Sequence, residues 1–369
     1  MSFMNNFQYH VITMAFQLSG KNDHPSSSTA AVPSAEQMQK ESKKKLMHNI
    51  FYFGFIIAGL RFASSMLNDG SAIIMITLNT GLILFWNILS IGIIISGTIT
   101  LNGLQSKRIP EFIRSLVLYG KFKSLKQQQS NDNDSMIKRW PTYYRLLSIL
   151  DAIIRMLEVP KYWFRHFYII SFLINSALII RMFCCSIQFE TIILIGLQWL
   201  QSLRRLYETF YVSIYSGNTI NLVHYIVGIF FYITIGLATF NDCHLVQSSN
   251  SSSSSSMIAV FIFFTSSAIQ YQSHRILAKL RSSKAKQNND YYIPRGGLFE
   301  YISCPHYMTE ILIYICLWLQ SSRSYLWSTM VMFVIANQTI ASLMSYRWYR
   351  KRFNDRYPTT IKALIPFLF

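Results

Sequence analysis

Residues 72–100 form a long apolar stretch that contains no charged side chain. A helix needs about 20 apolar residues to cross the hydrocarbon core of a bilayer, so this stretch is long enough to span it. Lipid offers the backbone no hydrogen-bond partners, and a helix satisfies its own backbone groups. The sequence therefore predicts a helical membrane protein.

Other apolar segments follow along the chain, and the composition agrees with them. Hydrophobic residues make up 51% of the sequence and charged residues only 14%, whereas about a quarter of the residues in a typical soluble domain are charged. We expect an all-α, multi-pass membrane bundle with seven core transmembrane helices, at residues 80–100, 163–184, 189–208, 218–240, 256–275, 306–321 and 325–344. A moderately apolar segment at residues 47–66 is a candidate for an extra N-terminal span.

The composition also divides the chain into parts. Residues 20–45 are rich in Ser, Pro and Lys and have little to bury, so we expect residues 1–45 to be a disordered N-terminal extension. Residues 46–105 would hold the N-terminal transmembrane segments. Residues 106–369 would form the main membrane domain, which contains the remaining spans.

Lysine and arginine outnumber the acidic residues by 34 to 16. They lie in loops beside apolar segments, which indicates anchoring at the cytosolic face and a phosphate-bearing ligand rather than nucleic acid. By the positive-inside rule, the basic loops at residues 107–161, 275–295 and 347–362 are cytosolic. The serine run at residues 248–256, with a glycosylation acceptor pattern at Asn250, then lies on the opposite side.

The sequence excludes several kinds of site. Five scattered cysteines form neither a disulfide framework nor a CxxC metal pair, and we expect no metal site. Without a GxGxxG or GxxxxGK[ST] motif, a nucleotide cofactor would be held by neither a Rossmann fold nor a P-loop. Its phosphates would need side-chain cations, for which Arg281, Arg295 and Lys279 are candidates. Tyr291 and Tyr292 could donate hydroxyls or stack on adenine, and a solvated basic loop is the alternative.

Ionisable residues enter the last apolar segments with helical spacing. A helix continuing out of the fifth span places Gln270, His274 and Arg281 on one face. His306 and Glu310 follow at an i+4 spacing at the start of the sixth span. Charged groups at bilayer depth are costly and normally face a protein interior or a wet cavity, so this pattern indicates a functional site. A purely structural pairing of Glu310 with a basic residue of a neighbouring helix is the alternative.

Four motifs carry a resemblance to a known family: SHRILAKLR, IPRGGLFEYIS, the later EIL, and the ending RWYRKRFNDRYPTTIKALIPFLF. Together they resemble the C-terminal half of the steroid 5α-reductase family of membrane NADPH enzymes. Two further segments, QSLRRLYETFYVSIYS and PKYWFRHFYIISFLIN, are more similar to its polyprenol reductase branch than to the steroid reductases. The resemblance covers about residues 112–369, which implies that residues 106–369 form the reductase catalytic domain.

The resemblance also implies roles for individual residues. Those that match NADPH-contacting positions of the family are Gln270, His274, Arg281, Tyr291 and His306, and the catalytic candidates near the nicotinamide are Glu310 and Tyr349. Arg205 matches an arginine near the substrate pocket. Glu208, three residues later, lies on the same helical face and could pair with it. A phenol such as Tyr349 can donate a hydrogen bond without being ionised at neutral pH.

The function that the resemblance implies is a reduction. An NADPH-dependent enzyme of this branch would reduce the α-isoprene double bond of a polyprenol-derived lipid, polyprenal to dolichal, in dolichol synthesis for protein N-glycosylation. It would lie in the endoplasmic reticulum membrane, with its active site facing the cytosol and its isoprenoid substrate in the bilayer. The alternatives are a trans-2-enoyl-CoA reductase, a 3-oxo-steroid 4-ene reductase, an isoprenylcysteine-type methyltransferase and a polytopic protein without catalysis.

The sequence departs from the family pattern at several positions. Where the family has Gln followed by an acidic residue, this chain reads Arg114 and Ser115. Tyr346 stands where many members have His, and Ile361 stands where a basic residue is usual. Arg356 is an additional residue that could supply the missing charge. The resemblance therefore allows a diverged or weakly active member of the family.

Overall fold

The computed structural model describes residues 72–102, 158–183, 187–215, 219–245, 253–288, 291–321 and 323–366. All of them belong to one compact unit, Gly54–Phe369. Four predictions concern residues outside these ranges: the N-terminal extension, the candidate span at residues 47–66, the acceptor pattern at Asn250, and the departures at Arg114 and Ser115.

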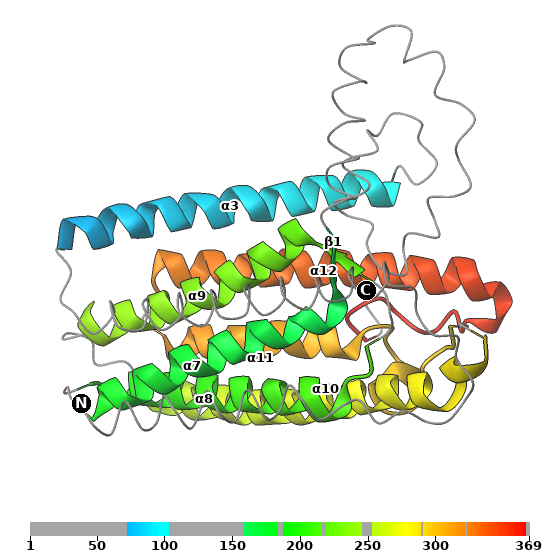
Figure 1. The fold of residues 1–369 in the computed structure, drawn as a ribbon. Helices are drawn as coiled ribbons and strands as arrows, with labels where there is room; N and C mark the ends of the chain where they lie inside the picture. The colour runs from blue at the N-terminus through cyan, green and yellow to red at the C-terminus, as the bar shows by residue number, and fades with distance from the viewer. Residues whose placement is uncertain are drawn as a thin grey trace, which may run out of the picture. The chain divides into compact units, whose positions relative to one another are not determined.

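Within the described ranges, helices carry nearly all of the secondary structure (Figure 1). They are α3 (Ala72–Asn102), α7 (Phe164–Met182), α8 (Phe189–Tyr207), α9 (Leu222–Leu245), α10 (Ser253–Asn288), α11 (Pro305–Gln320) and α12 (Tyr325–Phe353). Single turns accompany them: η2 (Lys161–Trp163), the π-helical turn η3 (Glu208–Val212), η4 (Gly297–Glu300) and η5 (Asn354–Arg356). Each helix coincides with one of the predicted spans, which confirms the prediction of a helical membrane protein.

Four of these helices, α3, α7, α9 and α12, are long and apolar enough to cross a membrane by length and composition. The other three, α8, α10 and α11, carry more charged and polar side chains, among them Arg204, Arg205 and Glu310, and polar side chains lower the hydropathy of a segment. α11 is also short, with 16 residues.

The helices pack around an apolar core. α10 runs against α11, α11 also contacts α8 and α12, α7 contacts both α8 and α9, and α3 lies along α12 (Figure 1). Trp86 on α3 is fully buried, with its ring centroid 4.7 Å from that of Phe333 and 5.7 Å from that of Phe231. α7 and α9 approach closely at Gly236, where a Cβ atom would collide with Ile174.

α10 continues beyond the predicted span at residues 256–275, as the spacing of Gln270, His274 and Arg281 predicted, and it ends at Asn288. The residues after 275 include several Leu, Ala, Lys and Arg, which are good helix formers, so the helix extends beyond its apolar part. As a result, His274 and Arg281 lie two turns apart on one continuous helix.

A short antiparallel ladder joins two distant segments. β1 (Glu158–Pro160) pairs with β2 (Thr219–Asn221), with Val159 opposite Ile220. Three-residue strands are too short for an alternating hydrophobic pattern to reveal, so the prediction of helices alone missed them. The ladder ties the segment before α7 to the start of α9.

The C-terminal tail is held against the segment that enters α11. Lys362 forms a parallel bridge with Ile302. The Ser303 N–H donates to the Lys362 carbonyl at 2.8 Å, and the Lys362 N–H donates to the Tyr301 carbonyl at 2.9 Å. The tail is therefore fixed beside the N-terminus of α11.

Candidate active site

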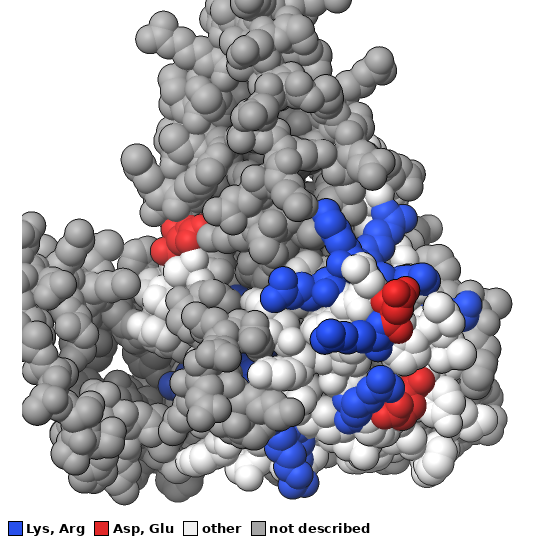
Figure 2. All heavy atoms as spheres, turned by 90° about the vertical axis from the view of Figure 1, so that its right-hand side faces the viewer, with Lys and Arg blue, Asp and Glu red and all other residues white. Residues whose placement is uncertain are grey.

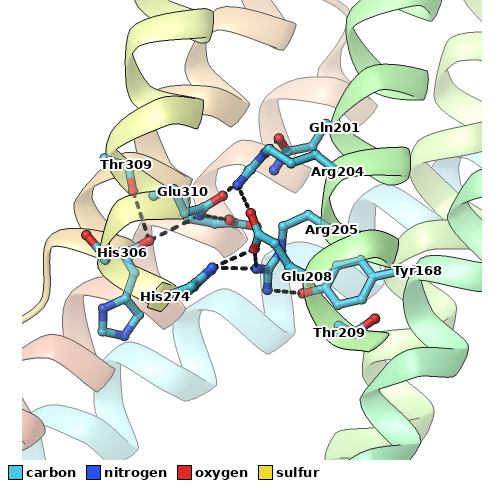
Figure 3. Close-up of polar contacts among 12 residues, drawn as sticks. Tyr168, Gln201, Arg204, Arg205, Glu208, Thr209, His274, His306, Thr309 and Glu310 are labelled. Carbon is cyan, nitrogen blue, oxygen red and sulfur yellow. Dashed lines mark hydrogen bonds and ion pairs between the residues drawn. The ribbon is translucent and has the colours of Figure 1, made fainter. Parts of the chain in front are cut away.

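Polar residues from three helices meet at the C-terminal end of α8 (Figure 3). Glu208 lies at the centre, with a fully buried side chain whose carboxylate accepts hydrogen bonds from Arg204 and Arg205. Nδ1 of His274, on α10, lies 2.7 Å from the same carboxylate. A buried carboxylate is tolerated only when it is paired, and two guanidinium groups and an imidazole provide the partners here. We call this set, together with Gln270 and Tyr168 described below, the polar cluster.

The local backbone explains how both arginines reach one carboxylate. α8 ends at Tyr207 and passes directly into the π-helical turn that begins with Glu208. Glu208 follows Arg204 by four residues and Arg205 by three, the spacings at which side chains on a helix meet. The Ser213 N–H donates to the Glu208 carbonyl at 2.7 Å and closes the wider turn. Single π-helical turns are rare and occur frequently at functional sites.

Gln270 connects this cluster to Glu310 on α11. Arg204 donates to its amide oxygen, and its amide nitrogen donates to the Glu310 carboxylate. The same nitrogen donates to the His306 carbonyl at 3.3 Å. Within the described residues Glu310 forms no direct salt bridge, and its side-chain hydrogen-bond partner there is Gln270.

One nitrogen of His274 lies between two partners. Nδ1 is 2.7 Å from Oε2 of Glu208 and also 2.7 Å from Nη1 of Arg205. With a proton, Nδ1 donates to Glu208; without one, it accepts from Arg205. The bonded neighbour therefore depends on whether Nδ1 carries a proton, which is true of the charged ring and of one of the two neutral tautomers.

Tyr168 on α7 belongs to the cluster and was missed by the sequence reasoning. Nη2 of Arg205 donates to its hydroxyl at 2.6 Å, and the guanidinium carbon lies 4.7 Å from the ring centroid. Arg204 and Gln201, joined by a 2.8 Å hydrogen bond, were missed as well. The adjacent pair of arginines was a signal for Arg204. Tyr168 is one of many aromatic residues in apolar segments, and the sequence does not tell which of them faces a polar partner.

The remaining predicted residues form a second group near the C-terminal tail. Arg281 is exposed, and its Nη1 donates to the Ile214 carbonyl at 3.0 Å. Tyr291 is 40% exposed, and its ring centroid lies 4.9 Å from that of Trp348. Tyr349 is buried, and its hydroxyl lies within electrostatic range of both Arg281 and Tyr291. We call Arg281, Tyr291 and Tyr349 the peripheral group.

His306 lies between the two sets of residues. Its carbonyl accepts from Gln270 of the polar cluster. Its ring centroid is 5.8 Å from that of His274 and 6.4 Å from that of Phe299 in η4. The structure therefore brings Arg205, Glu208, Gln270, His274 and Glu310 together, with Arg281, Tyr291 and Tyr349 in a separate group; the roles of all these residues stay predictions.

Exposed cations gather over the C-terminal ends of α10 and α12 (Figure 2). The exposed basic residues of this region are Lys279, Arg281, Arg295, Arg347, Arg350, Lys351, Arg352 and Arg356. Exposed acids among its described residues are Glu300, which lies 3.4 Å from Arg295, and Asp355. The surface around Arg281 therefore has a strong excess of positive charge.

Comparison with known proteins agrees with these observations. A family profile described as 3-oxo-5-alpha-steroid 4-dehydrogenase matches residues 218–369. A polyprenal reductase of Xenopus tropicalis is 31% identical over 255 residues, which cover 59% of this chain and 82% of the relative. The chain belongs to the steroid 5α-reductase family. The family predicted from the sequence motifs is thus confirmed, and membership identifies the chain as a reductase of a carbon–carbon double bond.

Other relatives carry the same name. A polyprenal reductase of Danio rerio is 33% identical over 248 residues, covering 57% of this chain and 80% of the relative. One of Homo sapiens is 30% identical over 256 residues, covering 59% and 80%. The range matched by the family profile contains Gln270, Glu310 and Tyr349, whereas Arg205 and Glu208 precede it.

The structure describes the surroundings of two residues that depart from the family pattern, Ile361 and Tyr346. Ile361 is 1% exposed in an apolar cluster with Trp348, Tyr349 and Tyr357. A basic side chain would be buried there, so an apolar residue suits this position. Tyr346 is half-buried, and its hydroxyl accepts from Arg350 at 3.0 Å. Arg356 is exposed.

The peripheral group fits an anionic dinucleotide. Arg281 is bonded to a neutral backbone carbonyl, and no salt bridge to a carboxylate joins it within the described residues. Its charge is therefore available to a phosphate, which an arginine can bind through two parallel hydrogen bonds. The described residues contain no group of His, Cys, Asp and Glu that could hold a metal ion.

Proposed function

We propose that this protein is an NADPH-dependent reductase that saturates the α-isoprene double bond of a polyprenal and yields the corresponding dolichal. The observation that carries the proposal is the similarity to polyprenal reductases over four-fifths of their length, 80–82% in the relatives compared. The reaction would serve dolichol synthesis and, through it, protein N-glycosylation.

The proposed cofactor is NADPH, which supplies a hydride when bound. Arg281 binds its phosphates, with Tyr291 beside it as a hydroxyl donor or a stacking surface for adenine. Gln270, His274 and His306 hold the cofactor on the side of α10 and α11. The support for this assignment is the exposed, carboxylate-free guanidinium of Arg281 and the shared helix of Gln270, His274 and Arg281.

Glu310 and Tyr349 are the proposed residues at the reacting end. Gln270 orients the Glu310 carboxylate through its amide hydrogen bond. Tyr349 is buried beside the N-terminus of α11, within electrostatic range of Cys304. A phenol there donates a hydrogen bond while staying neutral at physiological pH. Arg205 and Glu208 form the polar wall of the substrate pocket.

The aldehyde is the proposed substrate rather than the alcohol. A hydride adds to a carbon–carbon double bond when the resulting negative charge can move onto an oxygen atom, and the allylic alcohol has no such acceptor. In the conjugated enal the charge moves to the carbonyl oxygen, where protein donors stabilise it. The isoprene repeats need only apolar surface, so recognition is concentrated on the α-isoprene unit.

The proposed location is the endoplasmic reticulum membrane, with the site open to the cytosol. Support comes from the cations over the C-terminal ends of α10 and α12, which the positive-inside rule assigns to the cytosolic face. The polar cluster and the peripheral group both involve the C-terminal half of α10. An active site that opens to the cytosol could also take up NADPH from the cytosol.

The test is reduction by the purified protein. With NADPH, polyprenal should yield dolichal, measured by mass spectrometry, and matched polyprenol should yield no saturated product. A 3-oxo-4-ene steroid and a trans-2-enoyl-CoA are the comparison substrates. Saturation of the alcohol at the rate of the aldehyde, or faster reduction of either comparison substrate, would refute the proposal.

A further inference from the structure

The hydroxyl of Tyr168 occupies an unusual electrostatic position. It points from α7 toward the end of α8, where Nη2 of Arg205 donates to it at 2.6 Å (Figure 3). The guanidinium also lies over its ring, 4.7 Å from the centroid. Tyr168 is half-buried, so its side chain is not sealed into the core.

The hydrogen of this hydroxyl is available. A phenol has one hydrogen to donate in addition to its acceptor lone pairs. Within the described residues, the one hydrogen-bond partner of the Tyr168 hydroxyl is Arg205, which cannot accept. The donor capacity of Tyr168 is therefore unused by these residues.

Two neighbouring phenols differ from Tyr168 in their hydrogen-bond partners. Among the described residues, no hydrogen bond joins a guanidinium to the hydroxyl of Tyr232 on α9 or of Tyr314 on α11, whereas Arg205 donates to Tyr168. The Tyr232 ring packs edge-on against Tyr168, with centroids 5.7 Å apart. Tyr168 is thus the phenol of this set whose oxygen accepts from a cation, and its own hydrogen is free to be donated to a ligand.

The cation strengthens this hydrogen as a donor. A guanidinium bonded to the phenolic oxygen withdraws electron density from it and polarises the O–H bond. Glu208 balances the charge of Arg205 and fixes its position. A preorganised donor of this kind stabilises negative charge that develops on a substrate oxygen.

We propose that Tyr168 is a further catalytic residue, whose hydroxyl donates a hydrogen bond to the carbonyl oxygen of the enal substrate. This inference rests on the proposed function. As the hydride from NADPH forms a C–H bond at the β-carbon, the double-bond electrons shift to the Cα–carbonyl bond and the carbonyl electrons move onto oxygen. Tyr168 keeps its proton and stabilises that oxygen. The carbonyl re-forms when the α-carbon takes a proton from water.

Tyr349 does not duplicate this role. Its ring stacks on Tyr357 with centroids 5.5 Å apart, and its hydroxyl lies within electrostatic range of Arg281 and Cys304. It belongs to the peripheral group, and no hydrogen bond among the described residues joins its hydroxyl to Arg205. Tyr168 instead belongs to the polar cluster through its bond with Arg205, and Gln270 joins that cluster to Glu310.

The experiment compares Tyr168→Phe with wild type in the assay proposed above, in which purified protein reduces polyprenal with NADPH. Phenylalanine keeps the ring under Arg205 and removes only the hydroxyl. We expect kcat for polyprenal to fall about 100-fold, the loss typical for one donor to an oxyanion. The KM for polyprenal and the Kd for NADPH, measured by fluorescence titration, should change less than about threefold. Tyr211→Phe is the matched control, because Tyr211 is 68% exposed; it should keep wild-type kcat.

The outcomes separate the two proposals. If wild type does not reduce polyprenal, the proposed function fails. If wild type reduces it and Tyr168→Phe keeps more than a third of the wild-type kcat, Tyr168 is not the donor and the proposed function stands. A variant that loses NADPH binding and thermal stability together with kcat would assign Tyr168 a structural role and overturn the inference.

Discussion

The polar cluster and the peripheral group satisfy their charges in opposite ways. In the polar cluster, Glu208 is fully buried and neutralised by Arg204 and Arg205 of its own chain. In the peripheral group, Arg281 is exposed and bonded only to a neutral carbonyl among the described residues. In the first arrangement the buried carboxylate has its charge partners within the protein, whereas in the second the guanidinium has positive charge to offer to a ligand.

This difference suits the two sets of residues to different tasks: the polar cluster can hold side chains in fixed positions, and Arg281 can bind an anionic ligand. Buried, mutually bonded groups in a low-dielectric interior hold fixed positions, which is what a reacting centre needs. An exposed cation is solvated and interacts weakly until an anion arrives with matching geometry. Removing the buried charge of Glu208 should therefore affect folding, and removing the exposed charge of Arg281 should affect cofactor affinity.

The largest effect is expected from Glu208→Gln. Neutralising the carboxylate leaves two largely buried guanidinium groups without their charge partner, which typically costs about 3–5 kcal/mol. We expect much less monodisperse protein on size-exclusion chromatography and a clearly lower unfolding temperature in detergent. The matched control is Glu300→Gln, because Glu300 is 44% exposed and pairs with Arg295 at 3.4 Å. Equal stability of the two variants would show that burial makes no difference to these pairs.

Glu310→Gln should lower activity while leaving the fold intact. Glutamine can still accept the hydrogen bond from Gln270, but it cannot exchange a proton or carry charge at the reacting end. We expect kcat for polyprenal to fall about 100-fold, within the usual range for a lost acid–base group. Glu190→Gln, in the first turn of α8, is the control for neutralising a carboxylate elsewhere. A Glu310 variant with normal kcat and an altered unfolding temperature would make Glu310 structural.

Arg281→Ala tests the other side of the comparison. A hydrogen bond to a charged group contributes about 2 kcal/mol, so the Kd for NADPH should rise about 30-fold with little change in the KM for lipid. The difference should shrink at high ionic strength, because Arg281 is exposed. Arg350→Ala removes another exposed cation, one whose partner is the Tyr346 hydroxyl, and serves as the control. Unchanged cofactor affinity in Arg281→Ala would remove this residue from the proposed site.

The sequence predicted the helices because long apolar runs have few alternatives in a membrane. It also placed Gln270, His274 and Arg281 on one helix, because helical spacing is a local property. The π-helical turn at Glu208 was not predictable in this way, because it depends on backbone geometry that no residue pattern marks.

The contacts between helices were the least predictable part. Side-chain spacing along α10 does not reveal which helix faces it, so the link from Arg204 through Gln270 to Glu310 required the structure. The separation of Arg281 and Tyr349 from the polar cluster has the same cause. Tyr168 was hidden among other aromatic residues, and its contact with Arg205 joins positions 37 residues apart.

The smallest effect is expected in the C-terminal tail, at the edge of the peripheral group. The Tyr357 ring is 3% exposed and stacks on Tyr349 with an angle of 6° between the rings. Its hydroxyl lies 2.5 Å from that of Ser303. Ser303 in turn donates to the backbone carbonyl of Lys362, which pairs with the segment before α11. Tyr357→Phe keeps the stack and removes the bond between the two hydroxyls, which should lower the free energy of unfolding by about 1 kcal/mol. Ser303→Ala should have a larger effect, because Ser303 also donates to the Lys362 carbonyl at 3.1 Å, and the double variant should lose less than the sum.

The same tyrosine predicts a dependence on pH. Burial raises the pKa of Tyr357 to about 12, although the hydrogen bond with Ser303 opposes the shift; the ordinary pKa of a tyrosine is about 10. The unfolded chain therefore loses this proton at lower pH than the folded one, so the contribution of Tyr357 is complete below pH 10 and declines between about pH 10 and 12. Unfolding temperatures of wild type and Tyr357→Phe, measured from pH 8 to 11, should converge at the alkaline end. A constant gap across this range would mean that Tyr357 ionises equally easily in both states.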